Sequence, residues 1–217
     1  MSGIQQAQAF TGEIRRQVSA RYLVYLPEGY GQEPAKRWPL ILFLHGSGER
    51  GDDLALVRKH GPLKVVGEGT ALPFVIVAPQ CPADQVWSLD VLEGLLDHTL
   101  ADYAVDPSRV YLTGLSMGGY GTWEWGLQSA GRFAAMAPIC GGGNRISAYF
   151  AGTVPTWAFH GAKDDLVPAA ESERMVEALR ERGVEVRFTV YPEARHDSWT
   201  ETYNNPELYE WFLSHQR

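Results

Sequence analysis

The chain has 217 residues, of which 45% are hydrophobic and 21% are charged, a composition typical of a soluble globular protein. The formal net charge is −7, and no long basic run occurs, which argues against a nucleic-acid partner. No apolar run approaches the roughly 18 residues of a membrane span, and residues 1–10 do not form a secretory signal. We therefore expect a cytoplasmic protein without membrane association, folded as a single domain over residues 1–217 with a loose tail at 1–8. Its two cysteines, Cys81 and Cys140, are too few for a disulfide scaffold and are expected to be free thiols.

The first predicted strands lie near the N-terminus, around residues 13–18 and 20–26, and we expect them to pair antiparallel. Residues 27–31 contain Pro and Gly and end this pair, and a polar loop follows to Trp38.

From residue 39 onward, continuous apolar runs alternate with segments of helical character. Such runs suit strands that are buried on both faces of a parallel sheet, and they recur at residues 39–44, 74–78, 110–113, 134–139, 154–159 and 186–191. Helix-compatible segments lie near residues 54–66, 89–105, 117–129, 169–182 and 206–214. With the N-terminal pair included, the pattern predicts an α/β fold: a mostly parallel sheet of eight strands with helices on both faces.

Residues with chemically reactive side chains follow several of these strands directly. In an open α/β sheet, ligands bind beyond the carboxyl ends of the strands. The residues found there are His45 and Ser47 after the run at 39–44, Ser116 after 110–113, Asp164 and Asp165 after 154–159, and His196 after 186–191. We expect them to meet at one edge of the sheet.

Ser116 lies at the centre of the sequence Gly-Leu-Ser-Met-Gly, between a predicted strand and a predicted helix. G-x-S-x-G in this setting is the sequence form of a nucleophile elbow, a sharp turn that exposes a serine hydroxyl. Gly114 and Gly118 have no Cβ, so they permit the close approach of backbone that such a turn requires.

Three stretches together carry a resemblance to a known family: Gly114 to Gly119, His45-Gly46-Ser47-Gly48, and His160-Gly161-Ala162-Lys163-Asp164 with the following Val167-Pro168. With the order Ser116, Asp164, His196, the chain resembles serine esterases of the α/β-hydrolase superfamily over residues 22–213. Within the superfamily it is similar to small carboxylesterase/phospholipase-type esterases and to predicted peptidases and polyhydroxybutyrate-depolymerase-like esterases. The resemblance implies a serine hydrolase that cleaves carboxylic esters.

Three residues are candidates for the catalytic machinery. A serine hydroxyl needs an adjacent base to remove its proton, and His196, in a loop after the last strand, is the candidate base for Ser116. An acid must then orient the imidazole, and Asp164 and Asp165 compete for this role. The H-G-x-x-D pattern of the family favours Asp164, with Asp165 solvated or capping the next helix. His45 and His160 are expected to brace their loops.

The resemblance assigns the oxyanion hole to the backbone N–H groups of Ser47 and Met117. Trp87, Tyr120 and Trp199 are candidates for the lining of a substrate pocket, with core packing as the equal alternative. Residues 49–53 are expected to form a charged loop with Asp52 or Asp53 as a helix N-cap. No cluster has metal-ligand spacing, so the sequence predicts neither a metal nor a cofactor.

Residues 140–153, between two predicted strands, are too few for a cap domain. We therefore expect an open, shallow pocket bounded by residues 79–88 and 141–153, with a small-molecule ester of short acyl chain as substrate. The alternatives are a thioesterase, a peptidase or a feruloyl/aryl esterase with the same triad, and a catalytically idle binding scaffold. The sequence assigns no oligomeric state.

Overall fold

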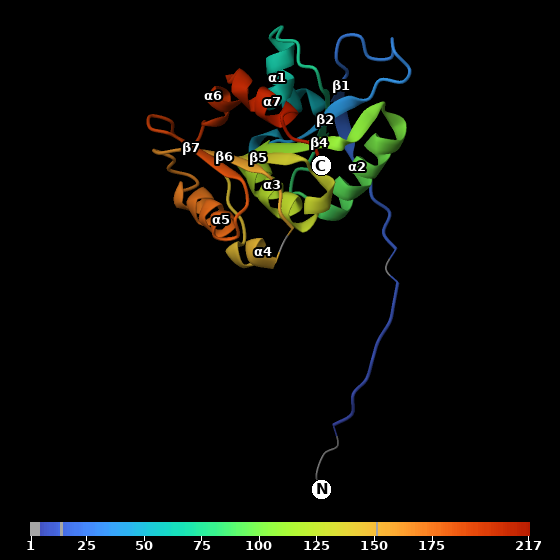
Figure 1. Cartoon of the computed structure of the whole chain (residues 1–217), viewed down its shortest axis with the longest axis vertical. Coiled ribbons are helices and arrows are strands. Elements are labelled where there is room, and N and C mark those ends of the chain that lie inside the picture. The colour runs from blue at the N-terminus through green and yellow to red at the C-terminus, as the bar shows by residue number, and fades with distance from the viewer. Residues whose placement is uncertain (1–4, 14, 151) are drawn as a thin grey trace.

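The computed structural model describes residues 5–13, 15–150 and 152–217, and Figure 1 shows a central twisted sheet with helices on both faces. The strands lie in the order β1-β3-β2-β4-β5-β6-β7, and all neighbouring pairs are parallel except β1 with β3. Their bounds are β1 Arg21–Tyr25, β2 Trp38–Leu44, β3 Val75–Gln80, β4 Val105–Leu115, β5 Ala135–Ile139, β6 Thr156–Gly161 and β7 Val186–Tyr191. The predicted mostly parallel α/β sheet is confirmed.

Four strands, β2, β3, β5 and β6, are buried along their whole length because helices cover both faces of the sheet. Every residue of β2 and of β3 is buried, as expected for strands whose sequences are continuous apolar runs. One face carries α2 Leu89–Asp102, α3 Met117–Gln128, α4 Arg145–Phe150 and α5 Ala170–Glu181; the other carries α1 Gly61–Gly67, α6 Trp199–Asn204 and α7 Pro206–Leu213 (Figure 1). Short 3₁₀ helices lie at Ser47–Glu49, Leu54–Arg58 and Ala130–Arg132.

The predicted count of eight strands is wrong, because the described residues form a sheet of seven. The second predicted N-terminal strand is β1, but its partner is β3, with Arg21 opposite Gln80. In the described part of the N-terminal region, residues 13 and 15–18 form no strand and are exposed, and residue 14 lies outside the described residues. Without burial, nothing offsets the conformational entropy that ordering a strand would cost. Of the expected tail, residues 5–8 are exposed and irregular, and 1–4 lie outside the described residues.

In the described residues between β5 and β6, the chain forms only α4, a helix of six residues, and no large cap. Among the described helices, none combines the length and the apolar character that a membrane span requires.

Cys81 and Cys140 are both buried and free, as predicted. Burial raises the pKa of the Cys140 thiol to about 12, despite hydrogen bonds from Ser116 and Ser198 that oppose the shift.

Candidate active site

Ser116 lies on the sharp turn between β4 and α3, in a backbone conformation that few non-glycine residues adopt. Its φ of 53° and ψ of −115° lie outside the common regions. The flanking glycines explain how the turn closes: a Cβ on Gly118 would lie 2.0 Å from the Leu44 carbonyl oxygen, and one on Gly114 would lie 2.4 Å from the Gly118 carbonyl oxygen. The turn therefore has the strain and the close packing expected of a nucleophile elbow.

A continuous hydrogen-bonded chain joins Ser116, His196 and Asp164. His196 Nε2 lies 2.9 Å from Ser116 Oγ, and His196 Nδ1 lies 2.8 Å from Asp164 Oδ2. A carboxylate only accepts hydrogen bonds, so Nδ1 carries the hydrogen and Nε2 is left to accept from the serine hydroxyl. The Asp164 side chain is fully buried, whereas 16% of the His196 side chain is exposed. The three residues predicted from the sequence thus lie in contact, with the serine end open to solvent.

The Asp164 carboxylate is surrounded by hydrogen-bond donors. Burial opposes its ionisation, but hydrogen bonds from His196 and from the backbone N–H groups of Val167 and Leu166 outweigh this and lower the pKa of Asp164. The buried His160 adds a further contact, since its Nε2 lies 3.2 Å from Asp164 Oδ2 and 2.8 Å from the Val167 carbonyl oxygen. His160 therefore braces the Asp164 loop, as predicted, and also touches the carboxylate itself.

The neighbouring Asp165 has a different environment. Its side chain is exposed and pairs with Arg195 at 3.2 Å, whereas the carboxylate bonded to His196 is that of Asp164. The local sequence did not decide between Asp164 and Asp165, and the family pattern favoured Asp164. The contacts in the structure agree with that choice.

The loop after β2 lies against the elbow. A Cβ on Gly46 would lie 3.6 Å from Ser116 Cβ, so the backbone before Ser47 passes close to the serine. Ser47 and Met117 each begin a helix, and the N–H of a first helical residue has no carbonyl acceptor within that helix. Ser47 thus lies in the loop that passes the elbow and Met117 directly follows Ser116, and the role of their N–H groups in an oxyanion hole stays a prediction.

Two buried side chains hold this loop, and sequence reasoning missed one of them. His45 accepts a hydrogen bond from the Cys81 N–H at Nε2 and donates from Nδ1 to the Gly46 carbonyl, so it is neutral and braces the loop as predicted. Burial lowers the pKa of His45, which also favours the neutral imidazole. Glu49, read as part of a charged loop, is only 6% exposed and accepts a hydrogen bond from the Gly46 N–H. A Glu three residues after a helix N-cap is half of a capping box, the signal that could have found it. Asp53 is an N-cap, as expected.

The aromatic candidates divide into two groups. Trp87 and Tyr120 line a groove of about 420 Å³ along α3, here called the Trp87 groove, whose full lining is Val86, Trp87, Met117, Tyr120, Gly121 and Glu124. Trp199 lies elsewhere: its ring packs edge-on against His196 at 5.3 Å between centroids, and its Nε1 donates to Nδ1 of His60. Trp199 therefore supports the histidine rather than lining the Trp87 groove.

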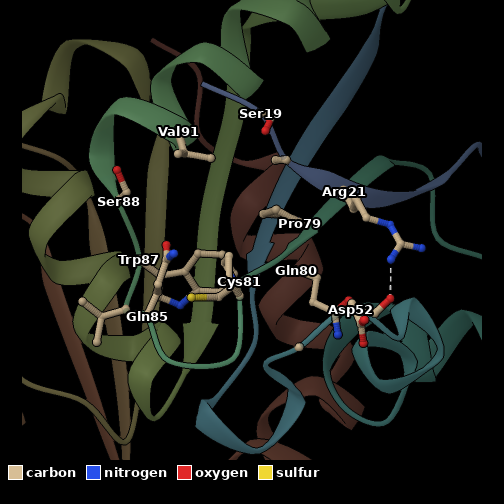
Figure 2. Close-up of a pocket in the computed structure, with 14 residues that line it drawn as sticks. Ser19, Arg21, Asp52, Pro79, Gln80, Cys81, Gln85, Trp87, Ser88 and Val91 are labelled. Carbon is tan, nitrogen blue, oxygen red and sulfur yellow. Dashed lines mark hydrogen bonds between the residues drawn. The ribbon is translucent and has the colours of Figure 1, made fainter. Parts of the chain in front are cut away.

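A second pocket, of about 370 Å³, shares Val86 and Trp87 with the Trp87 groove and is otherwise lined by different residues. Figure 2 shows Arg21 and Asp52 pointing toward one another across it, joined by a hydrogen bond from the guanidinium to the Asp52 carbonyl. Ser116 and His196 line neither this pocket nor the Trp87 groove, but Met117, the residue after Ser116, lines the groove. Within the described residues, no three His, Cys, Asp or Glu side chains gather as a metal site.

The chain is similar to several esterases and depolymerases. It is 30% identical over 171 residues to a bifunctional acetylxylan esterase/xylanase of Neocallimastix patriciarum, which covers 73% of this chain and 23% of the relative. It is 26% identical over 235 residues to a poly(3-hydroxyoctanoate) depolymerase of Pseudomonas fluorescens, covering 91% of this chain and 81% of the relative. A crystal structure of a thermostable esterase superposes with a TM-score of 0.78 and 34% identity, covering 90% of this chain and 59% of that one.

The chain thus spans less than a quarter of the Neocallimastix protein and about three fifths of the thermostable esterase. Its residues 83–208 match the model of the dienelactone hydrolase family, a segment that contains Ser116, Asp164 and His196. This match covers more than half of the chain and agrees with the α/β-hydrolase resemblance of the sequence, and the protein therefore belongs to the dienelactone hydrolase family.

Proposed function

We propose that the protein is a serine hydrolase that cleaves carboxylic esters through an acyl-enzyme on Ser116. The observation that carries this proposal is the unbroken chain of contacts from Ser116 Oγ through His196 to a buried Asp164, at 2.9 and 2.8 Å. Three side chains distant in sequence make these contacts at the end of a strained turn, which is the arrangement that activates a serine hydroxyl.

The proposed reaction has two halves. Ser116 Oγ attacks the ester carbonyl carbon while His196 Nε2 takes the hydroxyl proton, and Asp164 stabilises the imidazolium that forms. The N–H groups of Ser47 and Met117 bind the negative oxygen of the tetrahedral intermediate. His196 then gives its proton to the leaving alcohol, and in the second half it activates a water that releases the acid and restores Ser116.

The substrates that we propose are esters with short or compact acyl groups. The supporting observation is that two shallow hollows lie beside the elbow helix and share Tyr120 in their lining: the Trp87 groove, and a hollow of about 520 Å³ beside residues 142–144. Where a cap that could enclose a long acyl chain would be inserted, the described residues form only the short helix α4. The relatives named for acetylxylan and polyester substrates also act on esters. The cytoplasmic location expected from the sequence stays a prediction.

Among the other reactions open to such a triad, hydrolysis of aromatic esters is favoured by a specific observation, the pair Trp87 and Tyr120 in one groove beside the elbow. An idle binding scaffold is disfavoured, because nothing in binding alone requires the alignment of Ser116, His196 and Asp164.

The proposal is tested with a panel of 4-nitrophenyl esters from acetate to dodecanoate. Ser116→Ala and His196→Ala are each expected to lower kcat by a factor of about 10³ or more, by comparison with other serine triads. His98→Ala is the matched control, because His98 lies half-exposed on α2 and pairs with Asp102. Short acyl chains are expected to react fastest. Near-normal turnover by Ser116→Ala would contradict the mechanism, and a preference for dodecanoate would contradict the short-chain assignment.

A further inference from the structure

Three side chains form a line of contacts behind the proposed triad, here called the His60 network: Glu49, His60 and Trp199. Glu49 ends the 3₁₀ helix after β2, His60 directly precedes α1, and Trp199 begins α6. Helices α1 and α6 cover the same face of the sheet (Figure 1). The space between them beside His60 and Trp199 is only about 10 Å³, room for no more than about one water molecule. The two helices are therefore closely packed at this network.

One end of the His60 network lies against the proposed general base. The hydrogen bonds of His196 to Ser116 and Asp164 hold its two ring nitrogens. The ring of Trp199 packs against this imidazole at 5.3 Å between centroids and at 89° between planes, which limits the tilt of the imidazole plane. Trp199 is held in turn, because its Nε1 donates to His60 Nδ1 at 3.3 Å. The orientation of His196 therefore depends on a hydrogen bond that His60 accepts.

The other end of the network lies against the loop after β2. Glu49 Oε2 accepts a hydrogen bond from the Gly46 N–H at 3.1 Å, and Gly46 directly precedes Ser47. The second oxygen of this carboxylate, Oε1, lies 3.8 Å from His60 Nε2. The Glu49 side chain is only 9% exposed, so water screens its charge less than it would at the surface. One carboxylate thus contacts both the loop that carries Ser47 and the imidazole of His60.

The two contacts of His60 require the same tautomer of its neutral ring. An indole N–H only donates, so Nδ1 accepts from Trp199 and the hydrogen is on Nε2. Nε2 faces the Glu49 carboxylate, which only accepts. Donor and acceptor therefore match on both sides of His60.

His60 is held in place by the packing of α1 on β2. The next residue, Gly61, has a φ of 75°, and a Cβ there would lie 2.2 Å from Phe43 Cζ. Phe43 lies in β2, the strand that leads into the loop with Ser47. The same strand thus positions His60 and this loop.

We propose that His60 is a positioning residue for the ester hydrolysis proposed above, on which this inference rests. It joins the loop that carries Ser47 to the imidazole of His196 by a route that does not pass through Ser116. In the proposed reaction the loop binds the negative oxygen while the imidazole carries the proton, so the two must keep a fixed separation. A small displacement of either group lowers the rate of the chemical step.

Two substitutions of His60 separate its hydrogen bond from its packing. His60→Phe keeps a flat ring without an acceptor, whereas His60→Asn loses the ring but has an oxygen on Cγ, the atom to which Nδ1 is bonded. With 4-nitrophenyl acetate, His60→Phe is expected to lower kcat by about tenfold, the loss of one hydrogen bond, and to change KM less than about twofold. KM is spared because His60 lines neither hollow beside the elbow helix. His60→Asn is expected to retain kcat within about threefold.

Lys64→Ala is the matched control, because Lys64 lies one turn further along α1 and pairs with Glu68. It is expected to leave kcat unchanged. Urea denaturation of each variant confirms that the proteins compared are folded.

Double variants test whether the contacts act as one network. Trp199→Phe is expected to lower kcat by about tenfold in the wild type but by less than about twofold in His60→Phe, because both changes remove the same hydrogen bond. The combined loss in Glu49→Ala/Trp199→Phe is expected to be at least about threefold smaller than the product of the single losses, because each change interrupts the same path.

The outcomes separate this inference from the function on which it rests. If hydrolysis depends on Ser116 but His60→Asn is no more active than His60→Phe, the positioning role is overturned and the hydrolase stands. Where His60→Phe does not fold, near-normal kcat in Trp199→Phe overturns it as well. Losses in Glu49→Ala and Trp199→Phe that simply multiply overturn the connection between the loop and the base. If no ester is cleaved above the level of Ser116→Ala, the proposed function fails instead.

Discussion

Buried hydrogen bonds hold the carboxylate behind the proposed general base in its ionised form. The lowered pKa of Asp164 reflects donors from His196, Leu166 and Val167 that outweigh the cost of burial. A group whose pKa is lower in the folded state stabilises that state above its unfolded pKa, about 3.9 for Asp, and loses this contribution as pH falls through the folded value. The stabilisation from Asp164 should therefore be complete near neutral pH and disappear in acid.

Asp164→Asn tests the direction of this pH dependence of stability, because the amide cannot ionise. We expect the difference in free energy of unfolding between wild type and Asp164→Asn to be largest near pH 7 and to shrink as the pH falls below about 4. Urea denaturation of both proteins between pH 3 and 7 measures it. A difference that stays constant or grows toward pH 3 would show that ionisation of Asp164 does not stabilise the fold.

For single residues, the sequence predicted which side chains carry chemistry better than it predicted the contacts and the burial of side chains. Ser116 and His196 follow from motif and position, and the choice of Asp164 over Asp165 needed the family pattern, since adjacent residues share the same local signals. The contact between His60 and Trp199 joins residues 139 positions apart, so only the folded chain reveals it. Glu49 was missed because a carboxylate in a charged stretch is usually solvated.

Among the elements, α3 breaks the usual rule for glycine in a helix. Glycine costs about 1 kcal/mol relative to alanine inside a helix, so Gly→Ala is ordinarily stabilising. At Gly118 the added Cβ would meet the Leu44 backbone at 2.0 Å, and backbone cannot move aside as a flexible side chain can. We expect Gly118→Ala to destabilise the protein by about 3 kcal/mol or more.

Gly67→Ala is the matched control, because Gly67 is also helical, in α1, and nothing lies within 4 Å of its added Cβ. This variant should be neutral or stabilising by up to about 1 kcal/mol. Chemical denaturation compares the two. Equal effects of the two substitutions would mean that the close packing of the elbow is not what requires Gly118.

The parallel strands were predictable because burial on both faces leaves an uninterrupted apolar run, as in β2 and β3. The short helices α4 and α6 were not, since six residues give too few turns for a helical period to stand out. The segment at residues 13–18 was assigned to a strand on local composition, but pairing depends on a partner, and β3 takes β1 instead.

For the whole molecule, the sheet determines where the site forms. The loops after β2, β4, β6 and β7 carry Ser47, Ser116, Asp164 and His196, and parallel strands bring their carboxyl ends to one edge. This convergence was predictable from chain order alone. The grooves beside it were not, because their walls come from loops whose paths depend on side-chain packing, as the contact of Trp87 with Gly121 shows.

The central claim is that this convergence makes one hydroxyl, that of Ser116, reactive. Treatment with a fluorophosphonate probe followed by peptide mass spectrometry tests it most directly. The account predicts stoichiometric labelling of Ser116, loss of ester hydrolysis in step with labelling, and much slower labelling of His196→Ala. Labelling of a different residue, or full ester hydrolysis by protein in which Ser116 is completely labelled, would contradict it.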